Sequence, residues 1–147
     1  MDADKLRRWW RDHQEIDRAL EETRLDLESP EPTSPRERCS RLAAALERHF
    51  ATEEEIYFPL AARVSEQSAC LLDRARRGHQ QLRERLQHLR AFADRGEIAS
   101  ARRTFSILLQ LLQAHEEDEV AILVELERLV TAPSLLTAPA SSPAALR

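Results

Sequence analysis

The chain of 147 residues is poor in glycine, aromatic side chains and cysteine. Its two glycines are too few for a fold with many tight turns, because glycine most readily adopts the backbone conformations that such turns need. Leucine, alanine, arginine and glutamate are abundant instead, and these residues favour helices. The composition therefore predicts an all-α protein, and the length is that of one compact domain.

Long apolar runs are also absent. Charged residues interrupt every stretch that approaches the roughly 18 to 20 apolar residues of a membrane-spanning helix. The start of the sequence has no basic segment followed by an apolar one, which is the pattern of a secretory signal. We therefore expect a soluble, cytoplasmic protein with no membrane partner.

The cysteines and the basic residues argue against a disulfide-linked protein and against a nucleic-acid-binding protein. Cys39 and Cys70 belong to no Cys-x-x-Cys pair and fall in different segments, so we expect no disulfide framework. Arg74, Arg76 and Arg77 form a short basic cluster, but the net charge is −4 and no aromatic residue is interleaved with them. We interpret this cluster as a solvated helix face and expect no nucleic-acid partner.

Four segments have apolar residues at steps of three and four, the spacing of one helix face. They cover about residues 3–27, 35–64, 66–93 and 98–130. A proline-rich stretch separates the first two segments, and Ser34-Pro35-Arg36-Glu37 has the pattern of a helix start with Ser34 as N-cap. Pro59 interrupts the second segment, which predicts a kink or a break near Glu55.

Short connections between the second, third and fourth segments place neighbouring helices antiparallel. The sequence thus predicts an all-α, up-down-up-down four-helix bundle over residues 1–130. Residues 131–147 are rich in proline, alanine, serine and threonine, and there we expect a disordered C-terminal tail.

Four of the five histidines form a repeat that includes two glutamates. The histidines come in two pairs with the same internal spacing of 36 residues, and the second histidine of each pair is followed by a glutamate four residues later. On a helix this step leaves an angular offset of only about 40°, so each glutamate lies on the face of its histidine. In the predicted bundle the four histidines lie at comparable depths and can meet in one layer of the core. The set is His13, His49, Glu53, His79, His115 and Glu119.

Four imidazoles and two carboxylates are the ligand types that a pair of transition-metal ions takes. Two six-coordinate ions have about twelve positions, and these ligands with one bridging oxygen fill about ten, which leaves about two for an external ligand. The lack of thiolate in the set favours iron, with manganese or zinc less favoured. We therefore expect two bridged iron ions that bind dioxygen, peroxide or nitric oxide.

Neighbouring polar residues fit the ligand set less well. Helical phase turns Glu54 and Glu116 by roughly 140° and 100° from the preceding histidines, so we assign them to solvent or to contacts with the ligands. Asp118, three residues after His115, remains a competing ligand. His88 has no counterpart in the repeat and no acid four residues later, which indicates a surface residue.

The ordered combination of these residues resembles the bacterial hemerythrin-like HHE cation-binding domain. The matching motifs are DHQEID at residues 12–17, HFATEEEIYFP at 49–59, the single His79, and HEEDE at 115–119. The resemblance extends over about residues 3–130. It implies an up-down four-helix bundle with a non-haem di-iron centre, in which the six residues of the repeat are the ligands.

Two departures from the oxygen carriers of that family bear on function. The carriers have a second histidine four residues after the ligand of the third helix, where this chain has Arg83. Their fourth-helix acid is an aspartate five residues after the histidine, whereas this chain has Val120 there and Glu119 one position earlier. The resemblance therefore implies a more open site with one protein ligand fewer, which argues against simple oxygen carriage.

Arg83 and Tyr57 are candidates for roles around the centre. Arg83 either pairs with an acid beside the ligands, draws an anionic ligand inward, or points out of its helix into solvent. Tyr57 lies one turn beyond Glu53, and either donates a hydrogen bond to an oxygen species at the centre or packs near Pro59.

Two classes of function remain open. In the first, the centre reacts with dioxygen or peroxide as an oxygenase, a peroxidase or a catalase does. In the second, the domain binds, senses or stores oxygen, nitric oxide or iron without turnover. A metal-free helical adaptor is the remaining alternative, since no nucleophile triad or phosphate-binding loop in the sequence favours another enzyme class.

Overall fold

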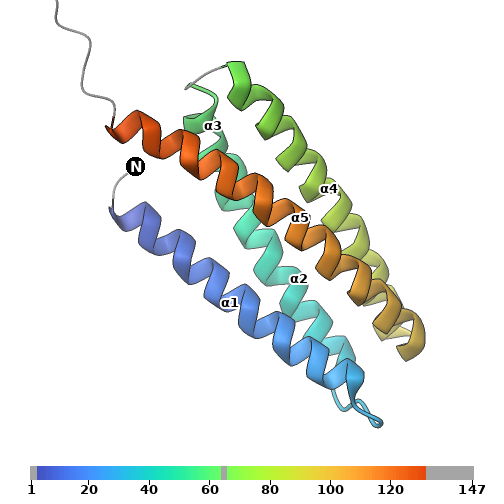
Figure 1. The fold of residues 1–147 in the computed structure, drawn as a ribbon. Coiled ribbons are helices and arrows are strands. Elements are labelled where there is room, and N and C mark those ends of the chain that lie inside the picture. The colour runs from blue at the N-terminus through green and yellow to red at the C-terminus, as the bar shows by residue number, and fades with distance from the viewer. Residues whose placement is uncertain (1–2, 64–65, 132–147) are drawn as a thin grey trace, which may run out of the picture.

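In the computed structural model the chain forms a bundle of long helices (Figure 1). The structure describes the backbone of residues 3–63 and 66–131 and the side chains of residues 11–63, 69–124 and 126. The elements are α1 (Ala3–Glu28), α2 (Pro35–Thr52), the π-helix η1 (Glu53–Tyr57), α3 (Phe58–Ala61), α4 (Glu66–Asp94) and α5 (Ile98–Thr131). Among the described residues, no helix combines the length and apolar character that crossing a membrane requires.

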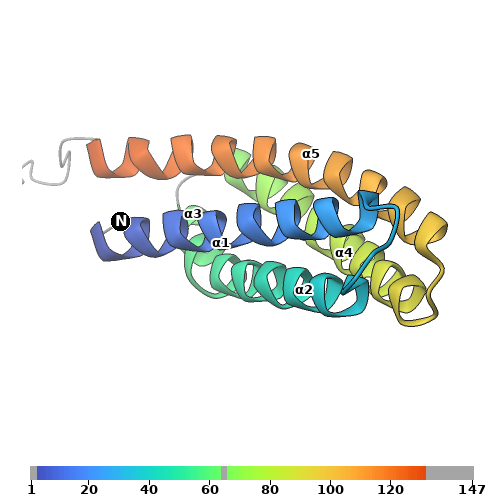
Figure 2. The ribbon, with the colours of Figure 1, turned by 90° about the horizontal axis from the view of Figure 1, so that it is seen from below.

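Successive long helices run in alternating directions. The hairpin of α1 and α2 stands beside the hairpin of α4 and α5, and α2 packs against α4. Figure 2 shows that the start of α1 and the end of α5 lie at the same end of the bundle. The prediction of an all-α, up-down-up-down four-helix bundle is therefore confirmed. The predicted tail lies outside the described residues, apart from Thr131 at the end of α5.

The ends of the helices follow from local chemistry. Ser34 precedes α2 as predicted, but its hydroxyl makes no capping bond. Asp26 of α1 holds this turn instead, because its carboxylate accepts hydrogen bonds from the backbone N–H groups of Thr33 at 2.8 Å and of Ser34 at 3.1 Å. After α4, Gly96 has a φ of 70°, the left-handed conformation that commonly ends a helix.

The predicted interruption by Pro59 takes the form of a π-helix. Proline has no N–H, and in an α-helix its ring would clash with the carbonyl of Glu55 four residues earlier. The backbone widens instead, and the N–H of Phe58 donates to the carbonyl of Glu53, five residues back. Single π turns are rare and often occur at functional sites, and this one begins at a predicted ligand.

Among the side chains that the structure describes, the buried apolar residues form two clusters. On α4, His79 lies between Ala75 of the smaller cluster and Leu82 of the larger one. On α5, His115 follows Leu112 of the larger cluster and precedes Ile122 of the smaller one. A polar layer therefore crosses the bundle between two apolar regions.

Candidate metal centre

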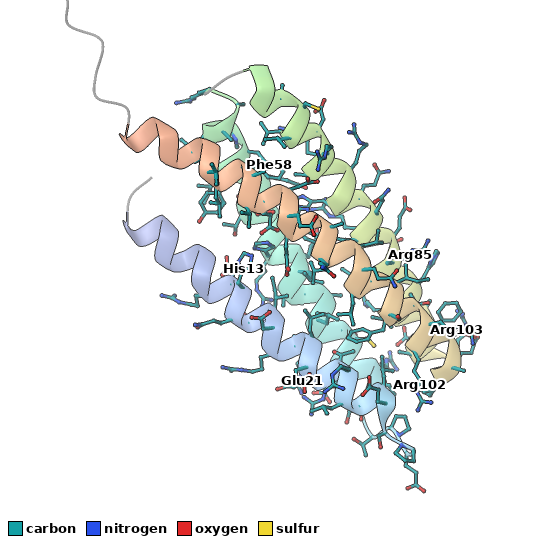
Figure 3. The ribbon with its side chains drawn as sticks, viewed as in Figure 1. His13, Glu21, Phe58, Arg85, Arg102 and Arg103 are labelled. Atoms are coloured by element: carbon teal, nitrogen blue, oxygen red, sulfur yellow. The ribbon has the colours of Figure 1, made fainter. Side chains whose placement is uncertain are left out.

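The six predicted ligands lie together in this polar layer. Five of them are at most 3% exposed, whereas His13, with a side chain that is 19% exposed, is the most open. Figure 3 labels His13 on α1, well away from Arg102 and Arg103 at the far end of the bundle. The remaining five are His49 on α2, Glu53 at the start of η1, His79 on α4, and His115 and Glu119 on α5.

Glu119 contacts three of the four imidazoles. Its Oε2 lies 3.1 Å from Nε2 of His13. Its Oε1 lies 3.2 Å from Nε2 of His49 and 2.8 Å from Nε2 of His115. The carboxylate thus reaches histidines on α1, α2 and α5.

Glu53, at the start of η1, also contacts three of the four imidazoles. Its Oε2 lies 2.9 Å from Nε2 of His79 and 3.5 Å from Nε2 of His115, while its Oε1 lies 3.7 Å from Nε2 of His49. Ligand atoms of Glu53, His49, His115 and Glu119 are all within 4.8 Å of one another. Each carboxylate therefore contacts imidazoles from both histidine pairs, which is the arrangement of a bridging ligand.

The outer nitrogens of the imidazoles differ in their surroundings. Nδ1 of His79 lies 2.7 Å from Oε1 of Glu54, a carboxylate that also receives hydrogen bonds from Arg83. Nδ1 of His49 and Nδ1 of His115 are buried and have no hydrogen-bond partner in the described part of the chain. Buried polar nitrogens normally have a hydrogen-bond partner, so these two outer nitrogens are exceptions.

Aromatic rings enclose His79. Phe50 stacks on it with ring centroids 4.3 Å apart, and Phe58 stacks on it at 5.3 Å. The two phenylalanines belong to different apolar clusters, so they close the layer from both ends of the core. Apolar walls of this kind strengthen electrostatic interactions inside the layer, because they lower the local dielectric constant.

The charges in the layer support one another. Burial raises the pKa of the Glu119 carboxyl, but hydrogen bonds with His115, His13 and His49 outweigh this and hold its pKa well below the usual value. The same balance of burial against contacts with His115 and His79 lowers the pKa of Glu53. Burial lowers the pKa of His115, yet the two carboxylates raise it to about 9. The chain alone thus forms a buried cluster of carboxylates and imidazolium.

The other candidate residues are placed as follows. Arg83 pairs with Glu54, which supports the first of its three alternatives. Tyr57 is 3% exposed in the layer's π-helix. Asp118, the competing ligand, is bonded to Arg74 on α4 instead of entering the cluster. His88 is exposed, as predicted.

Thiols take no part in the layer. Cys39 lies in the larger apolar cluster, where burial raises the pKa of its thiol to about 12. Cys70 is free and exposed. The donor set of the layer is therefore imidazole and carboxylate only, which suits iron, manganese or zinc.

Gly78 is a residue of the site that the sequence interpretation missed. A Cβ atom at this position would lie only 3.1 Å from Nδ1 of His115. Glycine is costly inside a helix, by roughly 1 kcal/mol relative to alanine, so its place next to His79 was an available signal. The missing side chain lets the His115 ring lie against α4.

We expect Gly78→Ala to weaken metal binding by about 10-fold, because the His115 ring must move while Glu53 and Glu119 hold it. The metal-free protein should keep its stability to within about 1 kcal/mol, since alanine favours the helix. Competition with a chelator and urea unfolding measure the two effects. Gln80→Ala, at an exposed neighbouring position, is the control, and equal metal affinity in both variants would contradict this role of Gly78.

Comparison with known families agrees with the geometry. The model of the hemerythrin HHE cation-binding domain matches residues 4–127, which is most of the chain. Neither curated proteins nor solved structures match the chain significantly.

Proposed function

The chain belongs to the hemerythrin family of HHE cation-binding domains, and on this premise we propose that its polar layer holds two bridged iron ions that bind and react with dioxygen or peroxide. The ligands in this proposal are the four histidines of the repeat with Glu53 and Glu119. The observation that carries it is the position of the two carboxylates, each in contact with imidazoles from both histidine pairs. A single ion would leave the imidazoles of one histidine pair without a metal to bind.

The fit of the residues to such a group rests on the chain's own chemistry. Nε2 of His79 and Nε2 of His115 lie 3.1 Å apart in a fully buried place. These nitrogens lie beside two buried carboxylates, whose negative charge must be balanced by protons on the imidazoles or by metal cations. A pair of iron ions bound there would supply the binding and reduction of dioxygen or peroxide.

The chain's residues prepare the layer for small ligands. Phe50 and Phe58 exclude water from the His79 side. His13, the most exposed member of the set, leaves the α1 side as the more accessible one. The other five members are at most 3% exposed. Dioxygen, peroxide and nitric oxide therefore fit the layer better than a bulky substrate does.

A second candidate function is binding, sensing or storage of oxygen, nitric oxide or iron without turnover. The apolar stacking of Phe50 and Phe58 on His79 favours it, because an enclosed apolar site protects a bound ligand from water. The departure at Arg83 favours the reactive alternative, since this position supplies no additional imidazole to the set.

We expect anaerobic loading with ferrous iron to give about two iron ions per chain, since six shared protein ligands exceed the needs of one ion. Elemental analysis after removal of free iron measures this. One ion or none per chain would contradict the bridged centre.

The loaded protein then separates the two functions. Irreversible oxidation by dioxygen, or consumption of added peroxide, supports the reactive centre. Reversible uptake of dioxygen without any consumption of peroxide would leave the binding module as the better account.

A further inference from the structure

A chain of polar contacts leads from His79 to the surface between α2 and α4. Nη1 of Arg83 donates to Oε1 of Glu54 at 2.9 Å, and its Nη2 donates to Oε2 at 3.4 Å. The same Oε1 atom lies 2.7 Å from Nδ1 of His79. On its outer side, Nε of Arg83 lies 3.0 Å from both oxygens of Glu47. Arg83 therefore lies between an inner and an outer carboxylate.

From these contacts we infer that Glu54 and Arg83 are positioning residues that hold a proton on Nδ1 of His79 and keep its Nε2 directed at the centre. This inference rests on the proposed function for the identity of the centre. The orientation of His79 itself is a property of the chain and can be measured without iron.

The imidazole of His79 has two nitrogens that can carry a proton. A neutral histidine carries its proton on one of the two ring nitrogens. A carboxylate beside one nitrogen holds the proton there, because it accepts a hydrogen bond from that N–H. Glu54 supplies that acceptor at Nδ1. Nε2, which lies 2.9 Å from Oε2 of Glu53 and 3.1 Å from Nε2 of His115, is then the nitrogen that a cation at the centre would take. Acceptors in this position commonly orient metal-bound histidines.

The side chain of Glu54 is 35% exposed, so water competes for its oxygens. A guanidinium binds both oxygens of a carboxylate in a fixed fork, which a lysine ammonium cannot reproduce. Arg83 also lies over Phe50, with its Cζ 5.4 Å from the ring centroid, and Phe50 stacks on His79. Arg83 thus fixes Glu54 and the ring that supports His79.

The buried histidines differ in the surroundings of their Nδ1 atoms. In the described part of the chain, Nδ1 of His49 and Nδ1 of His115 have no hydrogen-bond partner, whereas Nδ1 of His79 has a charged one. A change at Glu54 or Arg83 should therefore alter His79 and leave the other two rings as they are. A general loss of packing would affect all three.

Zinc is a suitable probe, because it binds the same ligand types and its release to a chelator can be followed by absorbance. We expect zinc to leave Glu54→Ala about 10- to 100-fold faster than the native protein, as is typical when a partner of a ligand is removed. Arg83→Met should give a smaller acceleration, and Arg83→Lys should restore part of the native rate. Glu55→Ala removes the same charge at the next, exposed position and is the matched control.

A second measurement reports on His79 directly. In nitrogen-15 spectra of the metal-free protein, a hydrogen-bonded proton on Nδ1 of His79 is expected in the native chain and in Glu55→Ala. It should be lost in Glu54→Ala and broadened by exchange in Arg83→Met, while the His49 and His115 signals stay unchanged. Circular dichroism confirms that each variant keeps its helices. Should Glu54→Ala fail to fold, Arg83→Met decides the question alone, because its side chain is 31% exposed in the native protein.

Either of two results would overturn the inference. One is zinc release from Glu54→Ala and Arg83→Met at the rate of Glu55→Ala. The other is an unchanged Nδ1 proton signal of His79 in Glu54→Ala. Failure of the proposed function, seen as a different number of ions or as no reaction with dioxygen, would leave the His79 signal where it is.

Discussion

Glu119→Ala is expected to lower strongly the affinity of the polar layer for both proposed metal ions. Its carboxylate contacts His13, His49 and His115, so its removal takes a shared ligand from both histidine pairs. The loss of affinity should exceed about 100-fold, because residues that only orient a ligand already cost about 10- to 100-fold when they are removed. Iron content after anaerobic loading, together with titration by zinc, measures the effect.

Glu116→Ala is the matched control for this change. Glu116 lies three residues earlier on α5, carries the same charge, and has an exposed side chain. Its substitution should leave about two ions per chain. If both variants kept about two ions per chain, Glu119 would not be a shared ligand. If both variants lost metal to the same extent, the charge on α5 would matter and the position of the carboxylate would not.

Glu53→Ala should resemble Glu119→Ala, because Glu53 contacts His79, His115 and His49 in the same way. Glu54 is no neutral control for it, although it is the adjacent residue, since its carboxylate contacts Nδ1 of His79. The pair of variants tests whether both carboxylates are shared between the ions.

The sequence was sufficient to predict the bundle and the meeting of the six side chains. Apolar periodicity fixes which face of each helix is buried, and a four-residue step keeps Glu53 with His49 and Glu119 with His115 on that face. Helix ends were also predictable. Proline has the fixed φ of a first helical residue, as at Pro35, and glycine readily adopts the left-handed conformation that ends a helix, as at Gly96. These features depend on local chemistry, which a single sequence contains.

The form of the break near Pro59 could not be predicted in the same way. Proline shows that the α-helical hydrogen bonds must change, but a kink, a break and a π-helix all satisfy that requirement. The structure selects the π-helix at residues 53–57. Within this turn, Glu53 contacts Nε2 of His79 while Glu54 contacts Nδ1 of the same ring.

Contacts between helices were the least predictable part of the site. The choice among the three alternatives for Arg83 depends on how α4 is rotated against α2, which periodicity defines only coarsely. The role of Asp118 also depends on a contact between helices. Its phase on α5 is compatible with a ligand, but in the structure its carboxylate pairs with Arg74 on α4. The role of Gly78 is likewise set by a neighbouring helix, because the lack of a side chain at this position lets His115 of α5 lie close to α4.

The stability of the metal-free protein should fall as the pH rises from about 6.5 to about 9. The contacts with Glu119 and Glu53 raise the pKa of His115 to about 9 in the folded chain, against an ordinary value of 6.5. A group whose pKa is raised on folding stabilises the protein fully below its unfolded pKa and ceases to do so as the pH passes the folded one. The loss is on the order of 3 kcal/mol, from the difference between these two values.

Acid acts in the opposite direction, because folding lowers the pKa values of Glu53 and Glu119. The stability that these carboxylates contribute is present above about pH 4.5 and is lost as the pH falls below it. The metal-free protein should therefore be most stable between about pH 4.5 and 6.5. Urea unfolding at pH 5.5, 7.5 and 9.5 measures the alkaline limb.

Metal binding should reverse this dependence on pH. A cation competes with the protons of the layer, so its affinity rises as His115 loses its proton, and the loaded protein gains stability where the metal-free protein loses it. His115→Gln should remove most of the alkaline limb from the metal-free protein, whereas His88→Gln, at an exposed histidine, should keep it. Equal stability of the metal-free protein at pH 5.5 and 9.5 would mean that the carboxylates do not hold a proton on His115. The layer would then not be a buried cluster of charges that favours the binding of cations.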